Sequence, residues 1–425
     1  MTDAQRALLA ALRRSGDPLP LLRSLTPDDW SELEHLARAH RVRPLLLRRL
    51  AAPAVRHLVP PAFVERLTQQ CRDIAFKNLA SQAELRSIGA LLAGEGIPMI
   101  VLKGAHLAPA YYGDAGLREM VDADVMVRPE HASRAWELIQ LRGYRPVTAP
   151  RCEPGALEWN HMPRLVKRGA LGIEVHWDVV MGRGARGTDR AGLWERSVPF
   201  APIGESARAL ATEDLIIHLA VHASYHHRFE FGLRPLCDLA AVIGQPVDWP
   251  ALVRRARDAS WDRGVYLMLR LTHDLIGAPV PASALESLRP TGFSDALLAD
   301  AAAELVDAPR TDISDRIAKV AGARGWSRLR LLLRRAFPSG ERLAREPEID
   351  VKAHGLLPSY LRLCRLLLRR HGALVWQLIG RRRRSEVNAA RRRLSLRLWL
   401  ATQSTGQDDI GHERLPHDPD VLTGL

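Results

Sequence analysis

The sequence contains few cysteines and no long hydrophobic run. Its 425 residues include four cysteines, which lie far apart and form no CxxC pair. Neither a disulfide framework nor a zinc ribbon is therefore expected, and a reduced intracellular setting fits. No apolar stretch approaches the roughly 20 residues of a membrane-spanning helix. Because the start, MTDAQRALLAALRRSG, also differs from a secretory signal, the sequence predicts a soluble, cytoplasmic protein.

Acidic residues are scarce in residues 324–397. The net charge is +13, yet residues 324–397 alone hold 20 Lys or Arg and 5 Asp or Glu, a balance of +15. This region favours an anionic partner. Aromatic residues are sparse there and no recognition motif appears, so nucleic-acid binding is not expected. Packed helices with basic side chains in water explain the pattern, and weak contact with an anionic membrane stays open for Arg381, Arg382, Arg383 and Arg384.

Helical periodicity surrounds one α/β stretch. In the N-terminal part, Thr26 is predicted to cap a helix that starts at Pro27. From Ile97 the period changes: PMIVLKG and DADVMV predict strands, PEHASRAWELIQLRG predicts a helix, and RLVKRGALGIEVHWDVV predicts a hairpin turning near residues 168–172. Helical signals return from Thr212. The expected fold class is α+β, a small mixed-sheet core flanked by N-terminal and C-terminal helical segments.

Three acidic residues are candidates for a metal site. Side chains alternate across a strand, so Asp122 and Asp124 share one face of VDADVMV. Acids on such a strand are costly unless they are solvated, paired or bound to a cation. Glu174, in the hairpin, could complete a cluster of the kind that binds Mg²⁺ in phosphoryl or nucleotidyl transfer. A solvated strand face is the alternative, and the residues alone do not separate the two interpretations.

A glycine turn precedes these acids. Lys103 and Gly104 end the first predicted strand and lead into the helix-like AHLAPAYYG. A glycine permits close backbone approach, a helix N-terminus offers free N–H groups, and a lysine supplies a positive charge, all of which suit a triphosphate. Many folds contain such a turn without a ligand, so this motif alone is weak.

Together these motifs resemble the nucleotidyltransferase superfamily with the DNA-polymerase-beta-like fold. More closely, the chain looks like bacterial nucleotidyltransferase family proteins, whose pattern reads IPxxxLKG, LYxDxGxRxxxDxDxLV, GY and ExHW. The resemblance extends over about residues 60–245 and includes a helical flank. The matching residues are Ile97, Pro98, Leu102, Lys103, Gly104, Tyr112, Asp114, Gly116, Arg118, Asp122, Asp124, Val127, Gly143, Tyr144, Glu174, His176, Trp177, His218, His222, Leu233, Arg234 and Asp238.

The resemblance implies a function and a set of site residues. Asp122, Asp124 and Glu174 are expected to hold Mg²⁺ or Mn²⁺, and Lys103 and Gly104 to bind the phosphates of a nucleoside triphosphate. The expected reaction transfers a nucleoside monophosphate to an unidentified acceptor. The chain departs from the family pattern at two places: Gly104 is followed by Ala105 rather than Gly or Ser, and Ala123 replaces a larger aliphatic residue between the aspartates.

Several further residues have more than one interpretation. Arg118 is expected either to contact a phosphate or to pair with Asp114. His176 shares the strand face of Glu174 and either orients a carboxylate, binds substrate or is simply hydrogen-bonded. The helical spacing of His218, His222 and His226 fits a zinc site, but a substrate-pocket role for His222 with Asp238 is favoured because these positions match the family pattern.

With the resemblance, the chain divides into five regions. A helical N-terminal region (1–94) precedes the nucleotidyltransferase core (95–205), a helical substrate-side region (206–280), a basic helical C-terminal region (281–402) and a tail expected to be disordered (403–425). Two alternatives to catalysis remain. One is a non-catalytic nucleotide-binding or interaction module of the same fold, and the other is an anionic-surface adaptor that acts through the basic C-terminal region.

Overall fold

The computed structural model describes residues 1–148, 159–180, 188–307 and 383–401. The chain divides into two compact units, one formed by Met1–Pro309 with Leu400–Leu425 and the other by Arg310–Trp399. Helix α21 (Arg383–Ala401) contains the described part of the second unit. Arg381, Arg382 and the predicted tail at 403–425 lie outside the described residues, and Arg383 and Arg384 are described only as backbone within α21. In the described ranges no helix is long and apolar enough to cross a membrane.

Six helices form the N-terminal part of the first unit. The N-cap predicted at Thr26 is confirmed and is part of a capping box: the Thr26 hydroxyl accepts a hydrogen bond from the Asp29 amide, and the Asp29 carboxylate accepts one from the Thr26 amide. Helix α6 begins at a Pro-Pro pair and runs for 34 residues, about 50 Å at 1.5 Å per residue. The six are α1 (Asp3–Leu12), α2 (Leu19–Arg23), α3 (Pro27–Ala39), α4 (Arg43–Leu50), α5 (Pro53–Arg56) and α6 (Pro61–Gly94).

A mixed sheet of seven strands follows, in the order β3-β4-β5-β2-β1-β7-β6. Its central strands are β1, β2 and β5: β2 pairs with β1 in antiparallel and with β5 in parallel fashion. The predicted hairpin is confirmed as the antiparallel pair of β4 and β5. The strands are β1 (Met99–Val101), β2 (Asp122–Met126), β3 (Arg145–Pro146), β4 (Leu165–Val166), β5 (Gly172–His176), β6 (Val198–Pro199) and β7 (Ala207–Ala209).

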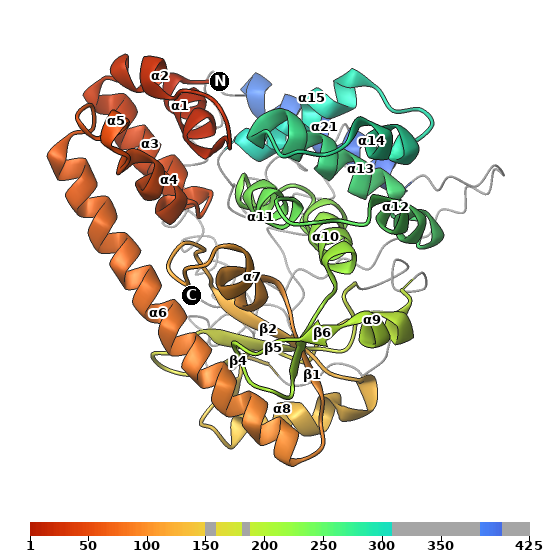
Figure 1. Cartoon of the computed structure of the whole chain (residues 1–425). Helices are drawn as coiled ribbons and strands as arrows, with labels where there is room; N and C mark the ends of the chain where they lie inside the picture. Colours follow the sequence, from red (N-terminus) through yellow and green to blue (C-terminus); the bar gives the residue numbers. More distant parts are fainter. Residues whose placement is uncertain (149–158, 181–187, 308–382, 402–425) are drawn as a thin grey trace, which may run out of the picture. The chain divides into compact units, whose positions relative to one another are not determined.

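One face of the sheet is apolar and covered by two helices. Val101, Val125 and Val175 lie on this face. They belong to one buried cluster with Leu85 and Leu92 of α6 and with the apolar side of α8 (Ala132–Gln140). Figure 1 shows α8 and the C-terminal half of α6 on the same side of the sheet. Because side chains alternate along a strand, the strand residues directly before each of these valines point to the opposite face of the sheet.

The opposite face is approached by the helices that build the site. Helix α7 (Lys103–Tyr111) contacts both β2 and α11 (Arg234–Ile243). The fold class is α+β, as predicted.

The remaining elements of the first unit are η1 (Pro129–His131), α9 (Arg190–Arg196), α10 (Thr212–Val221), the π-helical turn η3 (His222–His226), α12 (Trp249–Asp258), α13 (Asp262–Leu271), η4 (Thr272–Ile276), α14 (Ala282–Leu288) and α15 (Asp295–Val306).

A buried histidine on α7 links stability to pH. His106 packs edge-on against Tyr111 and Phe200, and burial lowers its pKa to about 4. In the unfolded chain the His106 imidazole binds a proton below about pH 6.5, whereas in the folded chain it stays neutral until about pH 4. The stability of the fold therefore falls as the pH drops from about 6.5 toward 4. Between pH 7 and pH 5, the free energy of unfolding of His106→Phe should fall by about 2 kcal/mol less than that of the wild type, as measured by urea unfolding.

The exposed His57 provides the control for this measurement. A His57→Gln variant should follow the wild-type pH dependence. Equal pH dependence of His106→Phe and wild type would show that His106 is protonated alike in both states.

Candidate active site

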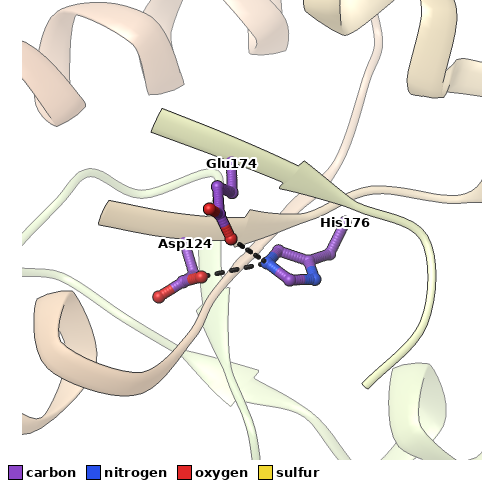
Figure 2. Close-up of side chains that lie close together, drawn as sticks. All are labelled: Asp124, Glu174 and His176. Atoms are coloured by element: carbon purple, nitrogen blue, oxygen red, sulfur yellow. Dashed lines mark hydrogen bonds and ion pairs between the residues drawn. The ribbon is translucent and has the colours of Figure 1, made fainter. Parts of the chain in front are cut away.

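Three side chains converge on the polar face of the sheet. Asp124 on β2 lies beside Glu174 on the parallel strand β5, and His176 follows two residues later on the same face. His176 Nε2 lies 2.9 Å from Asp124 Oδ1 and 3.5 Å from Glu174 Oε2 (Figure 2). One ligand atom from each residue lies within 4.8 Å of the other two. The parallel register thus brings together residues about fifty positions apart.

Lys103 supplies a second positive group to the same carboxylate. Its Nζ donates to Asp124 Oδ1 at 2.8 Å. Lys103 starts α7 with a φ of 43°, a left-handed conformation that residues with side chains usually avoid. The unusual backbone therefore lies directly beside the acids, where strain is often stored in functional sites.

The acids are ionised because Lys103 and His176 compensate for burial. Burial opposes ionisation of Asp124, but the charge of Lys103 and the hydrogen bond of His176 hold its pKa well below the usual range. Burial likewise opposes ionisation of Glu174, yet the hydrogen bond from His176 helps to lower its pKa to about 2. For His176, the bonds to both carboxylates outweigh burial and the charge of Lys103, so its pKa is raised. Lys103 and the hydrogen bonds of His176 thus stabilise the ionised forms of Asp124 and Glu174.

Asp122 lies on the same face but at its margin. It is half-buried at the start of β2 and pairs in register with Gly172. Burial and the charge of Asp124 raise its pKa, which places it within electrostatic reach of the cluster. It does not belong to the converging group formed by Asp124, Glu174 and His176 among the described residues.

Arg118 is engaged in a buried ion pair. Its Nε and Nη2 donate to the two carboxylate oxygens of Asp238 at 2.9 and 2.8 Å, and the Tyr112 hydroxyl also donates to Asp238. The alternative pairing of Arg118 with Asp114 is wrong, because Asp114 accepts from the Gly116 amide instead. Two residues expected at separate ligand positions, Arg118 and Asp238, therefore bind each other.

Gly104 makes room for this pair. A Cβ added at Gly104 would overlap Arg118 Nη1 and touch Met120 at 3.0 Å. The glycine is therefore explained by close packing of the guanidinium, a reason that the sequence did not reveal. The amide of Gly104 still lies in the first turn of α7, whose N-cap has no side-chain hydrogen bond.

The predicted row of helical histidines is interrupted. Helix α10 ends at Val221 and a π-helical turn follows, in which His227 N donates to His222 O at 3.0 Å. This turn places His227 Nε2 3.1 Å from His222 Nε2. His218, His222 and His226 form no group of three converging ligand atoms among the described residues. The zinc interpretation of that spacing therefore finds no support there.

These histidines form a neutral wall near the acids. Burial, with the charge of Lys103, lowers the pKa of His218, His222 and His227 well below the usual value and that of His226 to about 3. Both ring nitrogens of His218 lack a hydrogen-bond partner within the described residues. His227 was not singled out from the sequence, because the π-helical turn that pairs it with His222 has no evident local signal.

Comparisons with known proteins place the chain in a family. A family model described as "Uncharacterised nucleotidyltransferase" matches residues 26–277. A search of curated proteins found no match. Among solved structures, the solution structure of the antibiotic-resistance factor ANT(2'')-Ia is 12% identical, with a TM-score of 0.32 over 46% of this chain and 98% of that one.

The packing of Gly104 against Arg118 can be tested by a single methyl group. Gly104→Ala should destabilise the protein by about 2 kcal/mol, because the added Cβ displaces a guanidinium that Asp238 holds in place. Gly94→Ala is the matched control, since no heavy atom lies within 4 Å of its added Cβ and alanine stabilises a helix by about 0.5 kcal/mol or more. Urea unfolding measures both, and a Gly104→Ala protein as stable as wild type would contradict the packing argument.

Proposed function

Because the chain belongs to the family of uncharacterised nucleotidyltransferases, we propose that it uses Mg²⁺ or Mn²⁺ to transfer a nucleoside monophosphate from a nucleoside triphosphate to an acceptor. Membership in the family makes the chain a transferase with a nucleotide substrate. The metal, the site residues and the acceptor go beyond that membership. They rest on the arrangement of acids on the polar face of the sheet.

The convergence of Asp124, Glu174 and His176 is the observation that carries the proposal. Two ionised carboxylates on adjacent parallel strands offer the hard oxygen ligands that Mg²⁺ and Mn²⁺ accept. The acids are already charged at neutral pH, so no proton has to leave them before a cation binds. The donor set therefore fits a divalent cation.

In this proposal Asp124 and Glu174 hold the metal, and Asp122 contributes from the margin of the cluster. When bound, the metal supplies charge stabilisation for the reacting phosphate and its leaving pyrophosphate. His176 orients both carboxylates through its single Nε2 atom. Lys103 keeps the charge of Asp124 compensated when nucleotide is absent.

The first turn of α7 is proposed to bind the phosphate chain. The amides of Lys103 and Gly104 lie at a helix N-terminus without a side-chain cap, where backbone N–H groups and the helix dipole favour an anion. Lys103 Nζ, now on Asp124, adds a positive charge beside that turn. The predicted phosphate contact of Arg118 is replaced in this proposal, because Asp238 already binds its guanidinium in a bidentate pair. The substrate role predicted for His222 and Asp238 stays a prediction.

Loss of a carboxylate should abolish metal-dependent turnover. We expect Asp124→Asn and Glu174→Gln each to reduce Mg²⁺-dependent pyrophosphate release from a nucleoside triphosphate by about 100-fold or more, because each removes a charged oxygen ligand. A chelator should give the same loss with the wild-type protein. Calorimetry with ATP, GTP, CTP and UTP, with and without Mg²⁺, identifies the nucleotide that binds.

Glu137→Gln on the exposed face of α8 is the matched control and should behave like the wild type. Asp122→Asn decides whether the marginal aspartate belongs to the set. If Asp124→Asn and Glu174→Gln both keep metal-dependent binding and turnover, the proposed site is wrong. Metal-dependent binding without turnover against any acceptor would favour the non-catalytic alternative.

A further inference from the structure

Two arginines lie against one aromatic ring without a carboxylate partner among the described residues. The guanidinium carbon of Arg234 lies 5.4 Å from the centre of the Phe231 ring, and that of Arg41 lies 5.8 Å from it. The Phe231 ring also packs against His227, whose ring centre lies 3.8 Å away at an interplanar angle of 32°. An aromatic platform thus carries two positive charges.

A hydrogen bond joins the two distant segments of the chain that carry these arginines. Arg41 lies in the connection between α3 and α4, whereas Arg234 opens α11. The Leu233 amide donates to Nδ1 of the fully buried His40 at 3.3 Å. The residue before it, Gly232, has a φ of 64° and no room for a Cβ against the His40 ring. The α3–α4 connection is therefore fixed against the start of α11.

Arg234 has no close ion-pair partner among the described residues. Its Nε is buried without a hydrogen-bond partner among the described residues, and its Nη1 makes one long bond, 3.5 Å, to the Glu119 carbonyl. The neighbouring carboxylates are taken: Glu119 pairs with Arg43 at 2.7 Å, and Asp238 pairs with Arg118. A buried charged donor left unpaired is costly, so this guanidinium favours an anion.

The electrostatics of the pair agree with this geometry. Burial and the like charges of Arg118 and Arg41 lower the pKa of Arg234 to about 10. An anion placed between Arg41 and Arg234 would relieve that repulsion. The charges of Asp238 and Asp122 also act on Arg234, so the group lies within electrostatic reach of the aspartate at the margin of the acid cluster.

We propose that Arg234, assisted by Arg41, binds a phosphoryl group of a substrate beside the acid cluster. This inference rests on the proposed function, because it names a binding residue for the same reaction. Guanidinium groups suit the task, since their planar N–H donors match two phosphate oxygens at once. The phosphoryl group comes either from the phosphate chain of the nucleotide or from a phosphorylated acceptor, and both sources present the same chemistry to Arg234.

The experiment measures binding of simple phosphates to the full chain. Inorganic tripolyphosphate, ATP and orthophosphate are each titrated in the presence of Mg²⁺ by calorimetry, with wild type, Arg234→Gln and Arg41→Gln. We expect Arg234→Gln to weaken tripolyphosphate binding by about tenfold or more, and Arg41→Gln to weaken it by a smaller factor. Arg254→Gln removes the same charge from an exposed position on α12 and should bind like the wild type.

The three probes separate the two sources. Parallel losses for tripolyphosphate and ATP assign the site to the nucleotide, whereas a loss for orthophosphate alone assigns it to a phosphorylated acceptor. Unchanged binding of all three probes in both Arg234→Gln and Arg41→Gln overturns the proposal. Thermal melting of each variant shows whether it is folded, and Arg41→Gln keeps the test decisive if Arg234→Gln is not.

Failure of this inference can be distinguished from failure of the proposed function. Binding of tripolyphosphate requires no turnover, so an inactive protein with Arg234-dependent binding would contradict the transfer reaction and support the phosphoryl site. An active enzyme with unchanged binding in both arginine variants would support the transfer reaction and contradict the phosphoryl site.

Discussion

The compensation of the Asp124 charge is the constraint on which the site depends. A carboxylate in the interior is stable only with opposite charges and hydrogen bonds around it, and Asp124 obtains both from Lys103 and His176. Lys103 can reach it because α7 starts directly after β1, and His176 because β5 runs parallel to β2. The sheet order and the unusual backbone at Lys103 therefore serve one electrostatic requirement.

The same requirement accounts for the neutral histidines. Lys103 and the hydrogen bonds of His176 already stabilise the two carboxylates. Additional positive charge on His218 or His222 would lie near Lys103 in a region with little water, which is why their pKa values are low. Neutral imidazoles both donate and accept hydrogen bonds, so they can line a binding region without adding charge to it.

Local pattern predicted much of this arrangement. The alternation in DADVMV indicated that Asp122 and Asp124 share a face, and the hairpin pattern located the strand that carries Glu174 and His176. Both signals have a period of two and lie within a few residues. The N-cap at Thr26 was an equally local signal, and the α+β class followed from the order of such signals.

The contacts that were missed connect distant residues. Arg118 and Asp238 are 120 positions apart, and no property of either residue identifies the other as its partner. Gly104 was interpreted through its own turn, although its packing neighbour belongs to a later loop. Arg41 and Arg234 lie against the same Phe231 ring, and the hydrogen bond between Leu233 and His40 joins the two segments that carry them. Such pairings are set by tertiary packing, which a single sequence does not display.

Helix α6 connects the N-terminal helices to the site through one side chain. The amide of the buried Asn78 donates to the carbonyls of Ala115 and Arg118 and so holds the loop that carries the Arg118 guanidinium. The N-terminal half of the same helix packs on α3 and α4, whose connection carries Arg41. Helix α6 thus contacts both the loop that carries Arg118 and the two helices whose connection carries Arg41. A displacement of α3 and α4 would shift Arg41 directly and would shift Arg118 through α6 and Asn78. The packing of the N-terminal helices therefore sets the distance between Arg41 and Arg118.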